Sequence, residues 1–127
     1  MSLTNTYETH ALQYLLTTAT LTRPTAWYIG LYTADPTDTG SGATEISGNG
    51  YARKAATFTV TGNEATNSGS IDFDAATGSW GTISHIGIFD ALTSGNLLFT
   101  GALTTSKGVT TGDILRLSAG ELDITMD

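Results

Sequence analysis

The sequence predicts an all-β fold, an antiparallel β-sandwich of jelly-roll-like type with one short N-terminal α-helix. Apolar and polar residues alternate in several short segments, as in Ile71-Asp72-Phe73-Asp74, which is typical of half-buried strands. Threonine is frequent and favours strands, and 15 glycines provide frequent turn positions. A chain of 127 residues is long enough for one hydrophobic core, so we expect a single domain spanning residues 1–127.

The expected helix covers about residues 6–18. Asn5 is positioned to cap its first turn, and Glu8 follows at the spacing of a capping box. Three leucines share one face of this helix at helical spacing: Leu12, Leu15 and Leu16. That face either covers part of the protein's own sheet or docks onto a neighbouring subunit, and the sequence leaves both interpretations open.

The segment Trp27–Thr33 is expected to be a strand with Tyr28 and Tyr32 on one face. A long polar loop, residues 35–50, follows it. Its carboxylates could in principle bind calcium, but their spacing lacks the pattern of a known calcium loop, so a solvated acidic loop is preferred. If the loop has a function, the best interpretation is contact with a partner. These carboxylates are Asp35, Asp38 and Glu45.

The most apolar stretch, residues 80–102, predicts a β-hairpin. Its arms are Ile83–Phe89 and Leu97–Ala102, and Ser94-Gly95-Asn96 provides residues that tolerate positive φ in the turn. Trp80 is expected to close one end of the core. A turn is expected at residues 106–108, and further strands at residues 51–60, 70–74, 114–117 and 121–126.

The charge balance disfavours several classes of partner. The chain has 5 Lys and Arg against 12 Asp and Glu, for a net charge of −7, so binding to nucleic acid or to an anionic membrane surface is not expected. No apolar run approaches the roughly 20 residues of a membrane span, and no signal peptide is visible. Arg53-Lys54 is expected to be a solvated strand edge, or to pair with carboxylates of a neighbouring subunit.

Catalytic and metal-binding patterns are weak. Asp72 and Asp74 resemble a glycosidase pair only superficially, because both are expected on an exposed face. His85 and Asp90 lack the local signature of a nucleophile triad. The chain has no cysteine and only two histidines, so no metal or other cofactor is expected. We therefore predict that the protein is not an enzyme.

Exposed aromatic rings offer an alternative function. If their faces reach solvent, Tyr28, Tyr32 and Trp80 could stack on sugars, which would make the protein a carbohydrate-binding module for host-surface glycan. A charged fraction of only 13% favours instead a surface that is covered in an assembly. The residues expected at such a partner interface are Leu12, Leu15, Leu16, Tyr28 and Tyr32.

Four segments in this order resemble the small tail-fibre-like structural proteins of tailed bacteriophages and prophages. They are P-T-A-W-Y-I-G-L-Y-T-A-D-P-T-D (24–38), G-N-G-Y-A-R (48–53), the hairpin beginning W-G-T-I-S-H-I-G-I-F-D-A (80–107) and A-G-E-L-D-I-T-M-D (119–127). The resemblance implies a non-enzymatic virion component, tail-fibre-like or attached to the capsid as a decoration or spike protein. It implies contacts with other virion proteins and with copies of itself, and synthesis in the bacterial cytoplasm.

Overall fold

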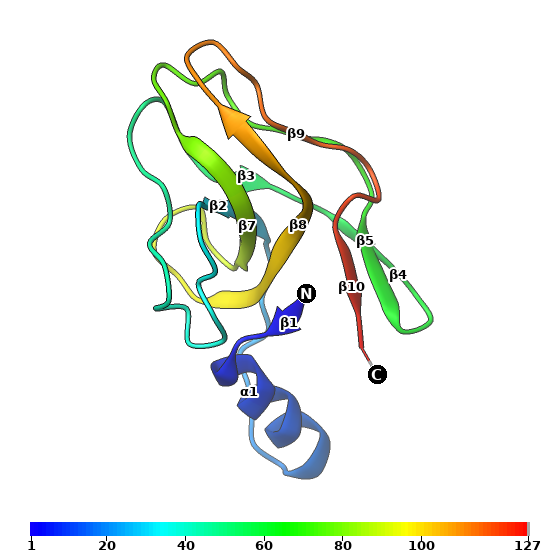
Figure 1. Ribbon diagram of the computed structural model, residues 1–127. Coiled ribbons are helices and arrows are strands. Elements are labelled where there is room, and N and C mark those ends of the chain that lie inside the picture. Colours follow the sequence, from blue (N-terminus) through cyan, green and yellow to red (C-terminus); the bar gives the residue numbers. More distant parts are fainter. Residues whose placement is uncertain (127) are drawn as a thin grey trace.

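A computed structural model describes residues 1–126 and confirms the predicted fold class, with antiparallel sheets and one short N-terminal helix (Figure 1). The helix α1 spans Asn5–Leu16. The strands are β1 (Ser2–Leu3), β2 (Tyr28–Tyr32), β3 (Lys54–Ala55), β4 (Phe58–Thr61), β5 (Glu64–Asn67), β6 (Ile71–Asp72), β7 (Gly81–Phe89), β8 (Leu97–Val109), β9 (Arg116–Leu117) and β10 (Asp123–Thr125).

One layer of the sandwich is a five-stranded sheet in the order β1-β8-β7-β2-β3. Its centre is the predicted hairpin of β7 and β8, and its turn uses positive φ at Ser94 and Gly95 as expected. The turn predicted at residues 106–108 is wrong, because β8 continues to Val109 and pairs Lys107 with Ile83. Backbone pairing to β7 holds this extension, although most of its side chains are exposed.

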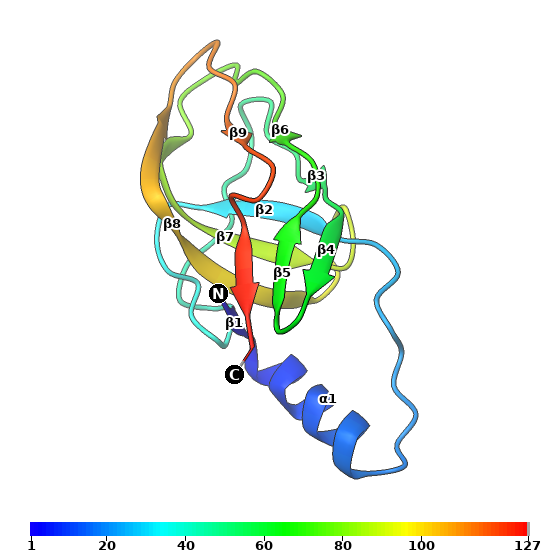
Figure 2. The ribbon, with the colours of Figure 1, turned by 90° about the vertical axis from the view of Figure 1, so that its right-hand side faces the viewer.

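The other layer contains a three-stranded sheet, β10-β5-β4, and the two-stranded pair β6-β9. The strand expected over residues 51–60 is split between the two layers. Its first part, β3, pairs with β2, whereas β4 pairs with β5. The chain therefore passes from one sheet to the other between Ala55 and Phe58 (Figure 2).

The hydrophobic core lies between these layers. The five-stranded sheet supplies fully buried isoleucines and leucine, including Ile29, Leu31 and Ile86, and Phe73 faces them from the opposite side. Trp80 is 6% exposed, at the end where β7 begins, and packs edge-on against Phe73. Its indole N–H donates to the carbonyl of Asn49 at 2.9 Å, so this ring closes the core with its polar atom satisfied.

The helix begins differently from the prediction. Thr4, not Asn5, is the N-cap, and its hydroxyl donates to the carbonyl of Leu97 instead of capping the helix. The capping box predicted for Asn5 and Glu8 is therefore wrong: the residue at the cap position uses its side chain to attach the helix to β8. Within residues 1–126, no helix is long and apolar enough to cross a membrane.

Candidate docking site

The leucine face of α1 is not covered by the other residues that the structure describes. Leu12, Leu15 and Leu16 are 60%, 72% and 77% exposed, and no residue of the helix is buried. The interpretation that these leucines cover the protein's own sheet is therefore wrong. Figures 1 and 2 show why: α1 projects beyond the lower end of the sandwich. Exposed leucines at helical spacing are the usual signature of a face that binds another protein surface.

The base of α1 is nevertheless firmly attached. The backbone N–H of Thr4 donates to the carbonyl of Leu98 at 2.9 Å, and that of Asn5 donates to the carbonyl of Asp38 at 3.0 Å. Tyr7, one turn into the helix, is partly buried near Asp90; burial raises the pKa of its hydroxyl, and the charge of Asp90 raises it further. The hydrogen bonds at its base therefore fix the direction of the helix, while the leucines of its C-terminal half remain exposed.

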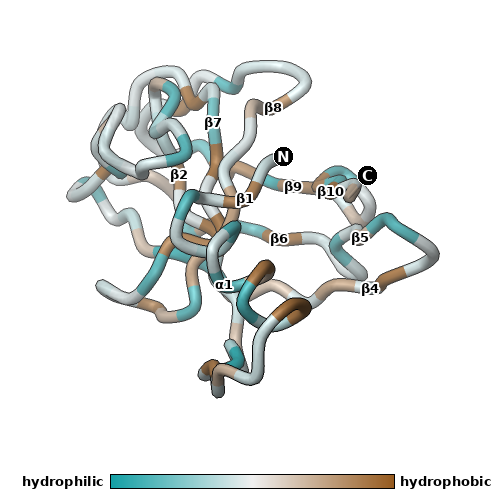
Figure 3. Tube along the Cα trace, turned by 90° about the horizontal axis from the view of Figure 1, so that it is seen from below, coloured by the Kyte–Doolittle hydropathy of each residue, from teal (hydrophilic) through white to brown (hydrophobic). Residues whose placement is uncertain are grey.

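An apolar groove of about 600 Å³ is lined in part by the β4–β5 hairpin, whose turn lies at the same end of the sandwich as α1 (Figure 2). It lies between the β4–β5 hairpin, the end of β10, and residues of β7 and β8. Figure 3, seen from below, shows apolar stretches on both α1 and β4 near this end. The apolar lining residues are Trp27, Phe58, Val60, Ala65, Ile88, Phe99, Ile124 and Met126.

Two residues on the rim of this groove are unusually exposed for apolar side chains. Val60 is 71% exposed and Met126 is 52% exposed. The alternation of Phe58 and Val60 in the sequence was a signal for a strand with one apolar face. The alternation did not reveal that Val60, in the second half of that strand, is left exposed and not packed against the opposite sheet.

The aromatic residues predicted for sugar stacking do not form an open platform. Tyr32 is 3% exposed and Trp80 is 6% exposed, so neither ring face reaches solvent; Tyr28 is half-buried. Burial, together with the charge of Glu45, raises the pKa of Tyr32 to about 12. Of the five residues predicted at a partner interface, the three leucines are thus accessible and Tyr32 is not.

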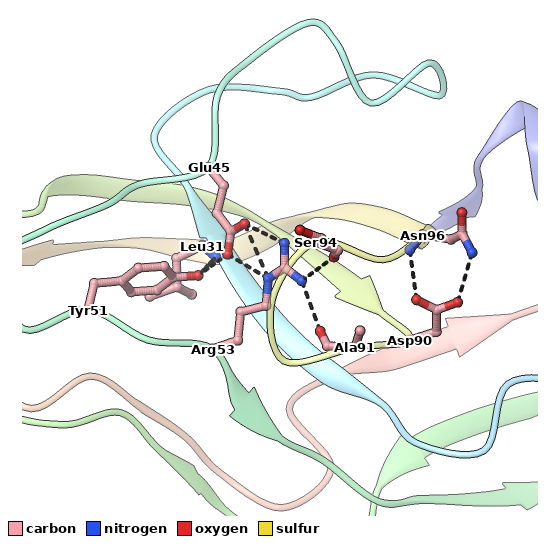
Figure 4. Close-up of polar contacts among 8 residues, drawn as sticks. All are labelled: Leu31, Glu45, Tyr51, Arg53, Asp90, Ala91, Ser94 and Asn96. Atoms are coloured by element: carbon pink, nitrogen blue, oxygen red, sulfur yellow. Dashed lines mark hydrogen bonds and ion pairs between the residues drawn. The ribbon is translucent and has the colours of Figure 1, made fainter.

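A polar cluster lies on the outer face of the five-stranded sheet, where Arg53 meets Glu45 (Figure 4). The guanidinium donates to both carboxylate oxygens of Glu45, at 2.7–3.2 Å, and to the carbonyls of Ala91 and Ser94. Burial lowers the pKa of Arg53, but its bonds with Glu45 outweigh this effect and raise it. The prediction of a solvated edge is therefore wrong for Arg53, whose side chain is 9% exposed.

Glycines make room for this cluster. Gly30 and Gly87 face each other across β2 and β7, and a Cβ at Gly30 would lie 2.7 Å from a Glu45 oxygen. Tyr51 donates a hydrogen bond to the same carboxylate, and burial, followed by this bond, raises the pKa of Tyr51. Glu45 thereby ties the long 35–50 loop to the sheet. It is engaged internally and does not join Asp35 and Asp38 in a cation site.

The remaining acid and base candidates are also engaged in structural bonds. Asp72 accepts from Arg116 at 2.7 Å, and this bond holds the pKa of Asp72 below its ordinary value, the opposite of what a general acid needs. Asp74 pairs with Lys54 at 2.8 Å, and His85 shares a hydrogen bond with the adjacent serine. Within residues 1–126, no three His, Cys, Asp or Glu side chains gather as a metal site would require.

Comparison with known proteins identifies the family of this protein. No curated protein matches the chain. A family model described as "Podophage GP4 fiber I protein gp80" matches residues 2–125, which include the helix, both sheets and the groove, and this confirms the resemblance to tail-fibre-like proteins. Because the match covers nearly the whole chain, the protein belongs to this family of phage fibre structural proteins, and its place is in the virion.

Proposed function

We propose that the protein is a non-enzymatic structural subunit of a phage fibre, which self-associates and docks onto other virion proteins through α1. The observation that carries this proposal is the exposed leucine face of a helix whose base is held rigidly. A protein that works alone gains nothing from leaving Leu12, Leu15 and Leu16 in water, because burying each leucine is worth about 1.5–3 kcal/mol. A partner surface that covers them recovers this free energy on assembly.

The experiment compares Leu15→Asp with Ile114→Asp, a control on an exposed apolar residue far along the chain from the helix. Leu15 is 72% exposed and Ile114 is 60% exposed, so both variants should keep the melting temperature of the wild type. Phage particles are assembled in cells that supply each variant, and the protein bound to purified particles is quantified.

We expect Leu15→Asp to be lost from the particles and Ile114→Asp to be retained. A carboxylate on the helix face would have to be buried without a partner in the contact, which is unfavourable. Incorporation of Leu15→Asp at the wild-type level would refute docking through α1.

A further inference from the structure

We propose that the partner of the α1 leucine face is the apolar groove of a second copy of this chain, and that two copies exchange their helices reciprocally. This inference rests on the proposed function and names the partner of the same site. It assigns a role to the groove between the β4–β5 hairpin and β10.

The two surfaces match in chemistry. The groove is lined mainly by aliphatic and aromatic side chains, with Phe58 and Phe99 on its walls and Val60 at its rim. The helix offers leucines at positions i, i+3 and i+4, which is the spacing of anchors in helix-in-groove recognition. The helix is a convex apolar surface and the groove is a concave one, so the two are complementary in shape as well as in chemistry.

The groove is lined by one cation and one anion, Arg23 and Glu64, and the cation is complementary to a carboxylate on the helix. Glu8 lies on the leucine face, one turn before Leu12, and is the only carboxylate of α1. Arg23 lines the groove and is exposed. In the described part of the chain neither residue takes part in an ion pair. A helix that lays Leu12 and Leu15 into the groove therefore has a carboxylate at one end that can meet the Arg23 guanidinium at the rim.

The attachment of α1 favours a second copy over the chain's own groove. The bonds from Thr4 and Asn5 fix the helix base in an orientation that leaves its leucines outside the groove of the same chain. From Leu16 the chain returns to β2 through residues 17–27, which contain neither helix nor strand. An extended segment of this kind lets a helix be presented to a neighbouring molecule, as in domain exchange.

Area favours a reciprocal exchange over one helix in one groove. A twelve-residue helix is about 18 Å long and about 10–12 Å across, so one face and the groove wall beneath it together lose about 400 Å². Specific interfaces bury about 1,200–2,000 Å² in total, and weak complexes bury less. Because helix and groove share one end of the sandwich, a twofold pair makes both contacts at once and buries about 800 Å². We therefore expect a reversible dimer.

Cysteine cross-linking tests the contact directly, because the natural chain contains no cysteine. Copies carrying Leu15→Cys are mixed with copies carrying Val60→Cys under mild oxidation, and the matched control pairs Leu15→Cys with Ile114→Cys. We expect a disulfide-linked heterodimer from the first mixture and none from the control. If the double variant Leu15→Cys/Val60→Cys instead closes an intrachain disulfide at a concentration where the chain is monomeric, the helix occupies its own groove and the proposal is overturned.

The strength of association gives a second readout by analytical ultracentrifugation. Leu15→Asp and Val60→Asp should each weaken dimerisation at least about tenfold, whereas Ile114→Asp should leave it unchanged. Glu8→Arg and Arg23→Glu should each weaken it several-fold, and combining the two should restore it, because the exchange recreates the pair with opposite polarity.

The outcomes separate this inference from the proposed function. If Leu15→Asp abolishes self-association but Val60→Asp does not, the helix binds another surface, so the groove assignment fails while docking through α1 stands. If the wild type stays monomeric up to about 1 mM, the exchange is refuted, because no dimer of useful strength exists. Docking through α1 fails only if Leu15→Asp is incorporated normally into particles, whereas a wild type that stays monomeric refutes the proposed self-association and leaves docking onto other virion proteins in place.

Discussion

Replacing Arg53 by alanine tests whether the cluster on the outer face of the sheet contributes strongly to stability. The guanidinium binds both oxygens of Glu45 and two backbone carbonyls, and its carbon lies 3.4 Å from the centre of the Phe89 ring. The side chain therefore ties three segments together: the 35–50 loop, the chain leading into β3, and the turn between β7 and β8.

The expected magnitude follows from burial. Removing one partner of a buried ion pair costs about 3–5 kcal/mol, because the other charge is left without compensation. The Glu45 side chain retains 20% exposure and the hydrogen bond from Tyr51, which places the expected loss near the lower limit, at about 3 kcal/mol.

The adjacent residue provides a matched control. Lys54 pairs with Asp74, but these side chains are 31% and 63% exposed, so Lys54→Ala should cost less than about 1 kcal/mol. Urea denaturation of both variants measures the free energy of unfolding. The double variant Arg53→Ala/Glu45→Gln, compared with both single variants, measures the coupling, because it also removes the charge that Arg53→Ala leaves behind. A loss for Arg53→Ala no larger than that for Lys54→Ala would refute the reasoning.

Three further predictions concern the core, the sheet and acid stability. Trp80→Ala should lower the free energy of unfolding by about 3–5 kcal/mol in chemical denaturation, because it empties a 6% exposed site. Gly87→Ala should cost about 1–3 kcal/mol, since its Cβ would lie 2.6 Å from a leucine methyl carbon, whereas Gly108→Ala meets no atom within 4 Å and should not destabilise. Burial opposes ionisation of Asp90, but hydrogen bonds from Asn96 prevail and lower its pKa. This stabilisation is therefore complete above the ordinary pKa and lost as the pH falls through the lowered value, so the stability difference between wild type and Asp90→Asn should vanish in strong acid.

Local pattern was sufficient where one face of a strand is buried. The predicted arm Ile83–Phe89 alternates clearly and lies within β7, which begins two residues earlier, and the loop that follows it contains Ser94-Gly95-Asn96. The sequence pattern did not predict the end of β8, because backbone hydrogen bonds to β7, and not buried side chains, hold it as a strand. Its last residues are mostly small or polar and mostly exposed, which is also typical of a turn. Likewise residue type favours Asn5 over Thr4 as the cap, and the bond from the Thr4 hydroxyl to the carbonyl of Leu97, which residue type does not reveal, accompanies the opposite outcome.

In the candidate docking site, too, the sequence predicts local features but not the contacts that depend on the fold. The spacing of Leu12, Leu15 and Leu16 was enough to identify an apolar face, but which surface it meets depends on the direction of the helix axis, which its base sets. Residue type does not show that the Arg53 side chain is more buried than that of Lys54, because the partner of Arg53, Glu45, comes from the 35–50 loop and its position depends on how that loop folds. Gly30 and Gly87, each in the middle of an apolar strand, are the readable signals that other groups approach the sheet closely.

The two attachments of α1 determine how tension applied to the helix would travel into the protein. On one side the helix follows β1, a two-residue strand at the edge of the sheet that pairs only with β8. On the other side, residues 17–27 lead into β2, which lies between β7 and β3 and matches β7 along five residue pairs. Under a pulling force the N-terminal side is held by the two residue pairs of β1 and by the hydrogen bonds of Thr4 and Asn5, whereas the C-terminal side is held by the five-pair ladder between β2 and β7. The two attachments therefore differ in kind: one is a short strand at the sheet edge with its flanking bonds, and the other is a strand with neighbours on both sides.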